Sequence, residues 1–151
     1  MVNFFVFREV QMLPVKVSTF IELFSSWART QSDIEAVALV GSYAREAAVE
    51  DSDVDLVILT ADPDRFLRDR SWIAIFGKVA RYQNEDYGRV TSVRVFYGNA
   101  LEVEFGFTTP AWAKSPIDEG TKRVVLGGIK VLHDPQRSIA RMVGEIESGA
   151  T

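Results

Sequence analysis

Two short apolar runs constrain the fold of this chain most strongly. Residues Ile34 to Val40 form an apolar run in which β-branched residues are frequent, and this favours a short buried strand. Residues Val54 to Thr60 are apolar on both faces beyond Asp55, a pattern typical of a central strand that is covered on both sides. Central strands of this kind need helices on both faces of their sheet.

Other segments supply the helices and the remaining strands. Apolar side chains from Val17 to Trp27 follow the spacing of an amphipathic helix, and the pairs Asp62-Pro63 and Asp134-Pro135 have the composition of helix starts. Gly98-Asn99 predicts a tight hairpin. We therefore predict helices that include residues 17–27, 43–49, 62–76, 118–126 and 139–146, and further strands at residues 78–83, 89–97, 101–107 and 129–132.

The predicted fold is α/β (α+β), a mixed central β-sheet with flanking helices. The 151 residues suit one domain with its own core, which we place at residues 1–151, with a possible extended arm at residues 1–13. No apolar run approaches the roughly 20 residues that span a bilayer, so we expect no membrane association and a cytoplasmic protein.

Composition excludes several classes of site. The chain has no cysteine and one histidine, which excludes disulfides, thiolate metal sites, cysteine nucleophiles and multi-histidine centres. The net charge of −4 argues against general binding of duplex nucleic acid, which normally requires a basic surface. A small anionic ligand held through a metal ion remains compatible with this charge.

The residues that suggest chemistry lie just after the first buried strand and at the start of the second. Gly41 lets the backbone turn sharply at the end of the first strand, and Ser42 offers a hydroxyl beside the amides of a helix start, an arrangement that favours phosphate oxygens. Asp53 and Asp55 lie two residues apart at the start of the second strand, so both carboxylates point to the same side. Oxygen ligands of this kind suit Mg²⁺ or Mn²⁺, which also coordinate substrate phosphates.

A third carboxylate is available on a later strand. From Leu101 to Phe107 the apolar side chains alternate with Glu102 and Glu104, so both glutamates face away from the core. Three carboxylates and a phosphate-binding turn are the components of two-metal phosphoryl transfer. The alternatives are that the aspartates form a solvated strand start and that the glutamates form the wet face of an edge hairpin.

These residues resemble the nucleotidyltransferase superfamily, which has the polymerase-beta-like fold. The shared pattern is the Gly-Ser turn at Gly41-Ser42, a short helix, the Asp-x-Asp strand at Asp53 and Asp55, and a third acid on a later strand. The segments Gly-Ser-x-Ala-Arg and Ser-Asp-x-Asp-Leu are most similar to the minimal and antibiotic nucleotidyltransferases. The resemblance covers about residues 34–107, the expected catalytic core.

The resemblance implies a metal-dependent enzyme and assigns its residues. Gly41, Ser42 and Arg45 would bind the triphosphate of a nucleoside triphosphate, for which we expect ATP, although Arg45 could instead pair with Glu46, Glu50 or Asp51. Mg²⁺ or Mn²⁺ would be held by Asp53, Asp55 and a third acid. We favour Glu102 as that acid, because the family's third acid usually follows the first apolar residue of its strand, and Glu104 stays open.

The implied activity is transfer of a nucleoside monophosphate to a hydroxyl of a small-molecule acceptor, with release of pyrophosphate. The alternative is an antitoxin-like regulatory module that nucleotidylates or masks a helical partner protein, and a homodimer is a further possible assembly. Two departures from the family pattern stand out. Glu46 replaces the glycine that often follows the arginine, and only residues 108–151 follow the predicted core, where many members carry a second, helical domain.

Overall fold

The computed structural model describes residues 13–49 and 52–149. The predicted arm at residues 1–13 therefore lies outside the described residues except for Leu13. The elements are α1 (Val15–Arg29), β1 (Ile34–Val40), α2 (Gly41–Arg45), β2 (Val54–Thr60), α3 (Pro63–Arg68), the 3₁₀ helix η1 (Ser71–Phe76), β3 (Val79–Asp86), β4 (Thr91–Tyr97), β5 (Glu102–Thr108), the 3₁₀ helix η2 (Pro110–Ala113), α4 (Glu119–Leu126), β6 (Lys130–His133) and α5 (Ser138–Ser148).

The strands form one mixed sheet in the order β3-β4-β5-β2-β1-β6. The central pair β2 and β5 is parallel, whereas the other neighbouring strands are antiparallel. The two apolar runs at residues 34–40 and 54–60 are the adjacent strands β1 and β2, inside the sheet. The predicted mixed sheet with flanking helices is therefore confirmed.

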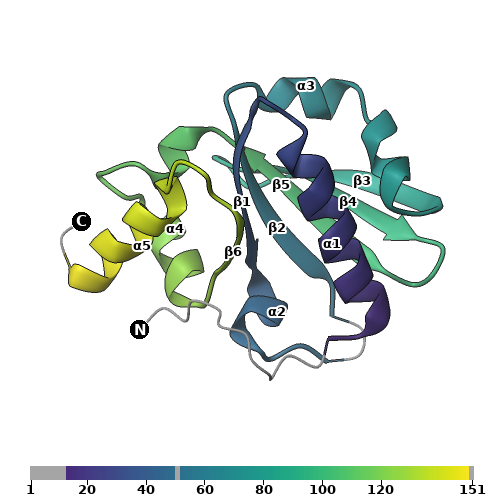
Figure 1. The fold of residues 1–151 in the computed structure, drawn as a ribbon, viewed down its shortest axis with the longest axis horizontal. Helices are drawn as coiled ribbons and strands as arrows, with labels where there is room; N and C mark the ends of the chain where they lie inside the picture. Colours follow the sequence, from purple (N-terminus) through teal and green to yellow (C-terminus); the bar gives the residue numbers. More distant parts are fainter. Residues whose placement is uncertain (1–12, 50–51, 150–151) are drawn as a thin grey trace.

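Both faces of the sheet are covered over its centre (Figure 1). One core packs α1 and η1 against the sheet through aromatic side chains such as Phe20, Phe24 and Trp72. The second core packs α4, α5 and η2 against β1 and β2. Figure 1 shows α1 on one side of β1 and α5 on the other, which explains why both central strands are apolar on each face.

Alternation along β2 and β5 decides where the polar side chains point. On β5, Val103, Phe105 and Phe107 are buried in the first core, as predicted. On β2 the first core takes Leu56 and the second takes Val57. Since neighbours on a strand point to opposite faces, the acids at odd positions of β2 and even positions of β5 lie on the same face as α4 and α5.

Two predicted helices differ from the structure. The helix predicted over residues 43–49 is the shorter α2, Gly41–Arg45, because Glu46 adopts a left-handed conformation and the Ala47 amide bonds back to the Ser42 carbonyl. The helix predicted over residues 62–76 is divided into α3 and η1. The chain is extended at Asp69, whose carboxylate accepts a hydrogen bond from the Ser71 amide and so ends the first helix.

The two Asp-Pro helix starts behave differently. Pro63 occupies the first turn of α3, but the Asp62 side chain makes no capping hydrogen bond. The Asp134 carboxylate accepts hydrogen bonds from the amides of Ile139 and Ala140, so it caps α5 from four residues before the helix begins. No helix within residues 13–49 and 52–149 combines the length and apolar character needed to cross a membrane.

Glu46 provides a test of the backbone at the end of α2. Its φ of 60° and ψ of 35° lie in the left-handed region, which costs a residue with a Cβ about 1–2 kcal/mol and costs glycine little. The Glu46 carboxylate also lies 3.6 Å from Lys130 Nζ. Both Glu46→Gly and Glu46→Ala remove that ion pair, so their comparison isolates the backbone. We expect Glu46→Gly to have a free energy of unfolding about 1 kcal/mol higher than Glu46→Ala in urea titrations. Equal stability of the two variants would contradict a strained residue at this position.

Candidate functional site

Gly41 lies where the end of β1 meets the start of β2. The antiparallel register places Val40 opposite Asp55, and Gly41 follows with a φ of +75°. A Cβ on Gly41 would lie only 2.1 Å from Asp55 Oδ2 and 3.1 Å from Asp55 Cβ. The glycine is therefore required by its positive φ and by the carboxylate that occupies the space beside it.

Three of the predicted acids meet at this end of the sheet. Carboxylate oxygens of Asp53, Asp55 and Glu104 lie within 4.8 Å of one another. The parallel register of β2 and β5 pairs Asp55 with Glu104 directly, and this pairing brings the acids of two distant segments together. The structure thus places Glu104 in the cluster with the aspartates.

Electrostatics disfavour full ionisation of this cluster by itself. Burial, and then the charge of Asp53 and contact with Glu104, raise the pKa of Asp55 to about 8. Burial also raises the pKa of Glu104. Glu104 Oε2 is buried and has no hydrogen-bond partner among the described residues. A divalent cation would offset the repulsion and supply that partner, so the donor set fits a hard, oxygen-binding metal such as Mg²⁺ or Mn²⁺.

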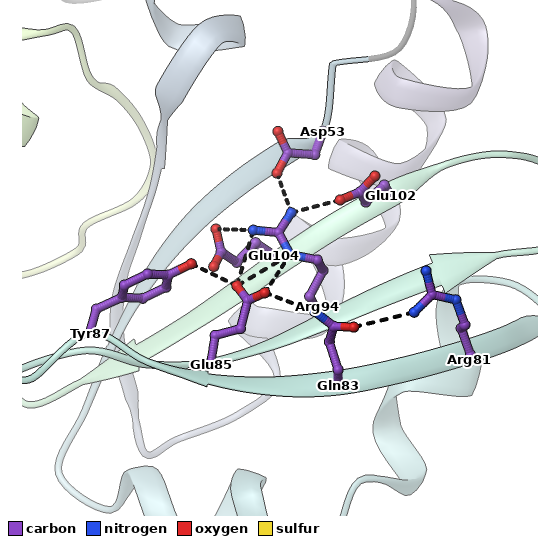
Figure 2. Close-up of polar contacts among 8 residues, drawn as sticks. All are labelled: Asp53, Arg81, Gln83, Glu85, Tyr87, Arg94, Glu102 and Glu104. Carbon is purple, nitrogen blue, oxygen red and sulfur yellow. Dashed lines mark hydrogen bonds and ion pairs between the residues drawn. The ribbon is translucent and has the colours of Figure 1, made fainter.

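The guanidinium of Arg94 contacts two acids of this cluster and two further carboxylates. Arg94, on β4, is 18% exposed and contacts four carboxylates (Figure 2). The partner distances are 2.7 Å from Nη1 to Asp53 Oδ2, 2.6 Å from Nη1 to Glu102 Oε2, 3.1 Å from Nη2 to Glu85 Oε1 and 3.3 Å from Nη2 to Glu104 Oε1. Glu102, the glutamate that the sequence favours as third acid, thus contacts Arg94 but lies outside the cluster of three acids, whereas Glu104 contacts Arg94 and belongs to that cluster.

Glu85, on β3, fixes the position of Arg94. Both oxygens of Glu85 accept hydrogen bonds from Arg94 Nε, at 3.2 and 3.1 Å. The Glu85 carboxylate also accepts hydrogen bonds from the Tyr87 hydroxyl at 2.6 Å and from Gln83 Nε2 at 2.9 Å. These donors, with Arg94 first, hold the pKa of Glu85 well below its usual range.

Sequence reasoning missed Arg94, Glu85 and Tyr87, although one signal could have found Arg94. The predicted hairpin at Gly98-Asn99 determines the register of the two strands beside it. In that register Arg94 pairs with Glu104 on the face opposite the first core. Glu85 and Tyr87 carried no comparable signal, because the register of β3 depends on a separate turn at Gly88.

The predicted phosphate-binding residues lie near the acids but have no partner that identifies their role. The Ser42 hydroxyl makes no hydrogen bond to any described residue. The backbone carbonyl of Ser42 accepts the amide hydrogen bonds that end α2. Arg45 is exposed and forms no ion pair within the described part of the chain. The alternative pairing of Arg45 with Glu46 does not occur, because Glu46 contacts Lys130 instead, and the other two possible partners, Glu50 and Asp51, lie outside the described residues.

The raised pKa of Asp55 predicts how pH affects the stability of the metal-free protein. The folded protein keeps this proton to about pH 8, whereas an unfolded aspartate loses it near pH 4. The free energy of unfolding should therefore fall as pH rises through this window. We expect Asp55→Asn to be more stable than the wild type at pH 8 by about 1 kcal/mol or more, and by less at pH 5. Urea titrations with a metal chelator test this, and an equal difference at both pH values would contradict it.

Gly41→Ala tests the close approach of Gly41 to Asp55. Rotation of the carboxylate relieves the contact with Oδ2 but leaves the Asp55 Cβ at 3.1 Å, and the positive φ remains unfavourable. We expect Gly41→Ala to lose about 2 kcal/mol or more of unfolding free energy and to weaken Mn²⁺ binding, since Asp55 must move. Gly144→Ala is the matched control, because a Cβ there meets nothing within 4 Å. A Gly41→Ala variant as stable as the wild type would contradict this account.

Comparisons with known proteins place the chain in a family. Residues 16–102, more than half of the chain, match the family described as streptomycin adenylyltransferase. No curated protein matches the chain. Among solved structures, an aminoglycoside 6-adenyltransferase from Bacillus subtilis has a TM-score of 0.52 at 17% sequence identity, over 68% of this chain and 37% of that protein. At this identity the match shows a shared fold.

The Cid1 poly(U) polymerase matches at a TM-score of 0.46 and 18% identity, over 62% of this chain and 30% of that protein. The chain spans 37% of the length of the Bacillus subtilis adenyltransferase, with which it shares its fold. The matched segment contains the Gly41-Ser42 turn and both aspartates, which carry the predicted resemblance. The chain belongs to the streptomycin adenylyltransferase family, within the nucleotidyltransferase superfamily.

Proposed function

We propose that the protein transfers a nucleoside monophosphate from a nucleoside triphosphate, ATP in the first instance, to a hydroxyl of a small-molecule acceptor. The observation that carries this proposal is the meeting of Asp53, Asp55 and Glu104 within 4.8 Å beside the turn at Gly41, in a chain of an adenylyltransferase family. The antitoxin-like alternative gains no support from the comparisons, and we do not propose it.

In the proposed reaction the acceptor oxygen forms a bond to the α-phosphorus while the bond to the departing pyrophosphate breaks. Asp53, Asp55 and Glu104 would hold Mg²⁺ or Mn²⁺, which would neutralise charge on the phosphates and on the leaving group. Ser42 and the amides that follow Gly41 would bind the triphosphate through its oxygens. Gly41 contributes by leaving room for Asp55.

Glu104 has two roles open to it in this scheme. Its Oε1 contacts Arg94, whereas its buried Oε2 has no partner among the described residues. That free oxygen can complete the metal site, or it can accept the proton of the attacking hydroxyl. Our assignment of the third acid to Glu104 in place of Glu102 rests on this position, since Glu104 is the glutamate whose carboxylate lies in the cluster with Asp53 and Asp55.

The charge around the site favours a cationic acceptor. Arg94 contacts the carboxylates of Asp53, Glu85, Glu102 and Glu104 (Figure 2), and Asp55 adds a fifth acid through its cluster with Asp53 and Glu104. Such a surface attracts cations, and it would accept an anion such as a triphosphate only together with the divalent metal. The family description names streptomycin, and the Bacillus subtilis protein is described as acting on an aminoglycoside, a polyhydroxylated cation. We propose an acceptor of this aminoglycoside-like class.

Activity assays with two acid variants test the proposal. The protein is incubated with Mg²⁺, ATP and a panel of aminoglycosides, and both pyrophosphate release and the adenylylated acceptor are measured. We expect Asp53→Asn and Glu104→Gln to lower the rate by roughly a hundredfold or more, since each removes a carboxylate that would hold the charge-neutralising metal or, for Glu104, accept the proton. Asp64→Asn, an exposed residue on α3, is the control and should keep the wild-type rate.

The same variants separate the roles of Glu104. Loss of both activity and Mn²⁺ binding in Glu104→Gln assigns Glu104 to the metal, whereas loss of activity alone assigns it to the proton. Wild-type activity in Asp53→Asn would refute the site. Absence of any adenylylated product across the panel would refute the proposed acceptor class.

A further inference from the structure

Arg94 is a fixed cation at the edge of the proposed metal site, and the inference below rests on that site. Two of its four partners, Asp53 and Glu104, belong to the group whose oxygens lie within 4.8 Å of one another. Asp53 and Glu104 thus contact the Arg94 guanidinium and would also be ligands of a bound metal ion. A metal ion that binds the Asp53 carboxylate must either share it with Arg94 or displace Arg94 from it.

The two edges of the Arg94 guanidinium have different partners, and one edge is anchored by Glu85. Nε and Nη2 bind Glu85, and Glu85 is held in turn by Tyr87 and Gln83 (Figure 2). Nη1 is directed at Asp53 and Glu102, at 2.7 and 2.6 Å. Since an arginine side chain presents its donors in a rigid planar fork, anchoring one edge fixes where the other edge points.

We propose that Arg94 is a positioning residue that acts as a built-in counter-cation: it holds Asp53 and Glu104 in the metal-free protein and weakens their binding of free divalent metal. A positive charge this close to the ligands opposes a second cation, and it stays charged at any working pH. The triphosphate removes the conflict, because its negative charge can compensate both the metal and Arg94. Metal therefore enters the site together with the nucleotide.

The alternative is that Arg94 only braces the sheet by linking β3, β4 and β5 to Asp53, the residue before β2. The two accounts predict opposite effects on metal affinity. If Arg94 only orients the carboxylates, its removal disorders them and weakens metal binding. If it competes with metal, its removal leaves the carboxylates free and strengthens metal binding, even when the variant is less stable.

Mn²⁺ titrations of the nucleotide-free protein at pH 7, by calorimetry or electron paramagnetic resonance, test the proposal. We expect Arg94→Met to bind Mn²⁺ at least about tenfold more tightly than the wild type. Arg81→Met is the matched control, because Arg81 lies on the adjacent strand over the Phe96 ring and contacts none of the clustered acids. It removes the same charge from the same face and should leave the affinity within about threefold of the wild type.

A second variant covers the case in which Arg94→Met does not fold. The double variant Arg94→Gln, Glu85→Gln removes one cation and one anion, so the net charge of the site is unchanged while the hold on Asp53 is lost. We expect it to bind Mn²⁺ at least about threefold more tightly than the wild type. In the wild type a non-hydrolysable triphosphate should enhance Mn²⁺ binding more than it does in either variant.

Three results would overturn the proposal. Unchanged or weaker Mn²⁺ binding in the folded Arg94 variants, beside measurable binding in the wild type, would refute the counter-cation role and leave the proposed metal site standing. An equal gain in Arg81→Met would reduce the effect to long-range charge. Absence of Mn²⁺ binding in every variant, with and without triphosphate, would refute both the inference and the metal site of the proposed function.

Discussion

The parallel pairing of β2 with β5 is the constraint on which the site depends. These two segments are nearly 50 residues apart in the chain, and their register places Asp55 directly beside Glu104. Apolar side chains alternate with the acids on both strands and fill the first core with Leu56, Phe105 and their neighbours. A slip of one residue would turn the acids into that core, so packing of the core and assembly of the carboxylates are the same event.

The clustered carboxylates repel one another, and several contacts in the structure offset this repulsion. Asp55 responds with a pKa raised to about 8, whereas Glu85 is kept ionised by Arg94. The guanidinium offsets part of the repulsion with donors aimed at four carboxylates. One carboxylate oxygen, Glu104 Oε2, is left without a partner among the described residues, and this marks where further positive charge would be most favourable.

Much of the fold followed from sequence because its signals were local. The buried runs, the hairpin at Gly98-Asn99 and the alternation of β5 all occur in the structure. The exact helix ends did not follow, since they depend on Glu46 adopting a left-handed conformation and on the Asp69 side chain bonding to the next turn. Such choices are decided by tertiary packing, which local propensity does not report.

The candidate site shows the same division. Gly41, Asp53 and Asp55 lie close together in sequence and form a recognisable pattern, whereas choosing between Glu102 and Glu104 required the register of strands β2, β4 and β5. The cluster of the aspartates with Glu104 favours Glu104 as the third acid of the proposed site, whereas Glu102 contacts Arg94 at 2.6 Å. A residue outside the sequence motif, here Arg94 on β4, can thus contact the acids of the motif, although the sequence predicted only a strand there.

The uneven coverage of the sheet fits this chemistry. The apolar contacts of α4 and α5 cover β1 and β2, and the charged side chains of β3 to β5 lie beyond them on the same face. An apolar helix packed over that region would bury five carboxylates with one guanidinium, at a large desolvation cost. Among the described residues, the charged part of the face therefore stays partly exposed for a physical reason, and it is there that a divalent cation would most lower the electrostatic energy of the fold.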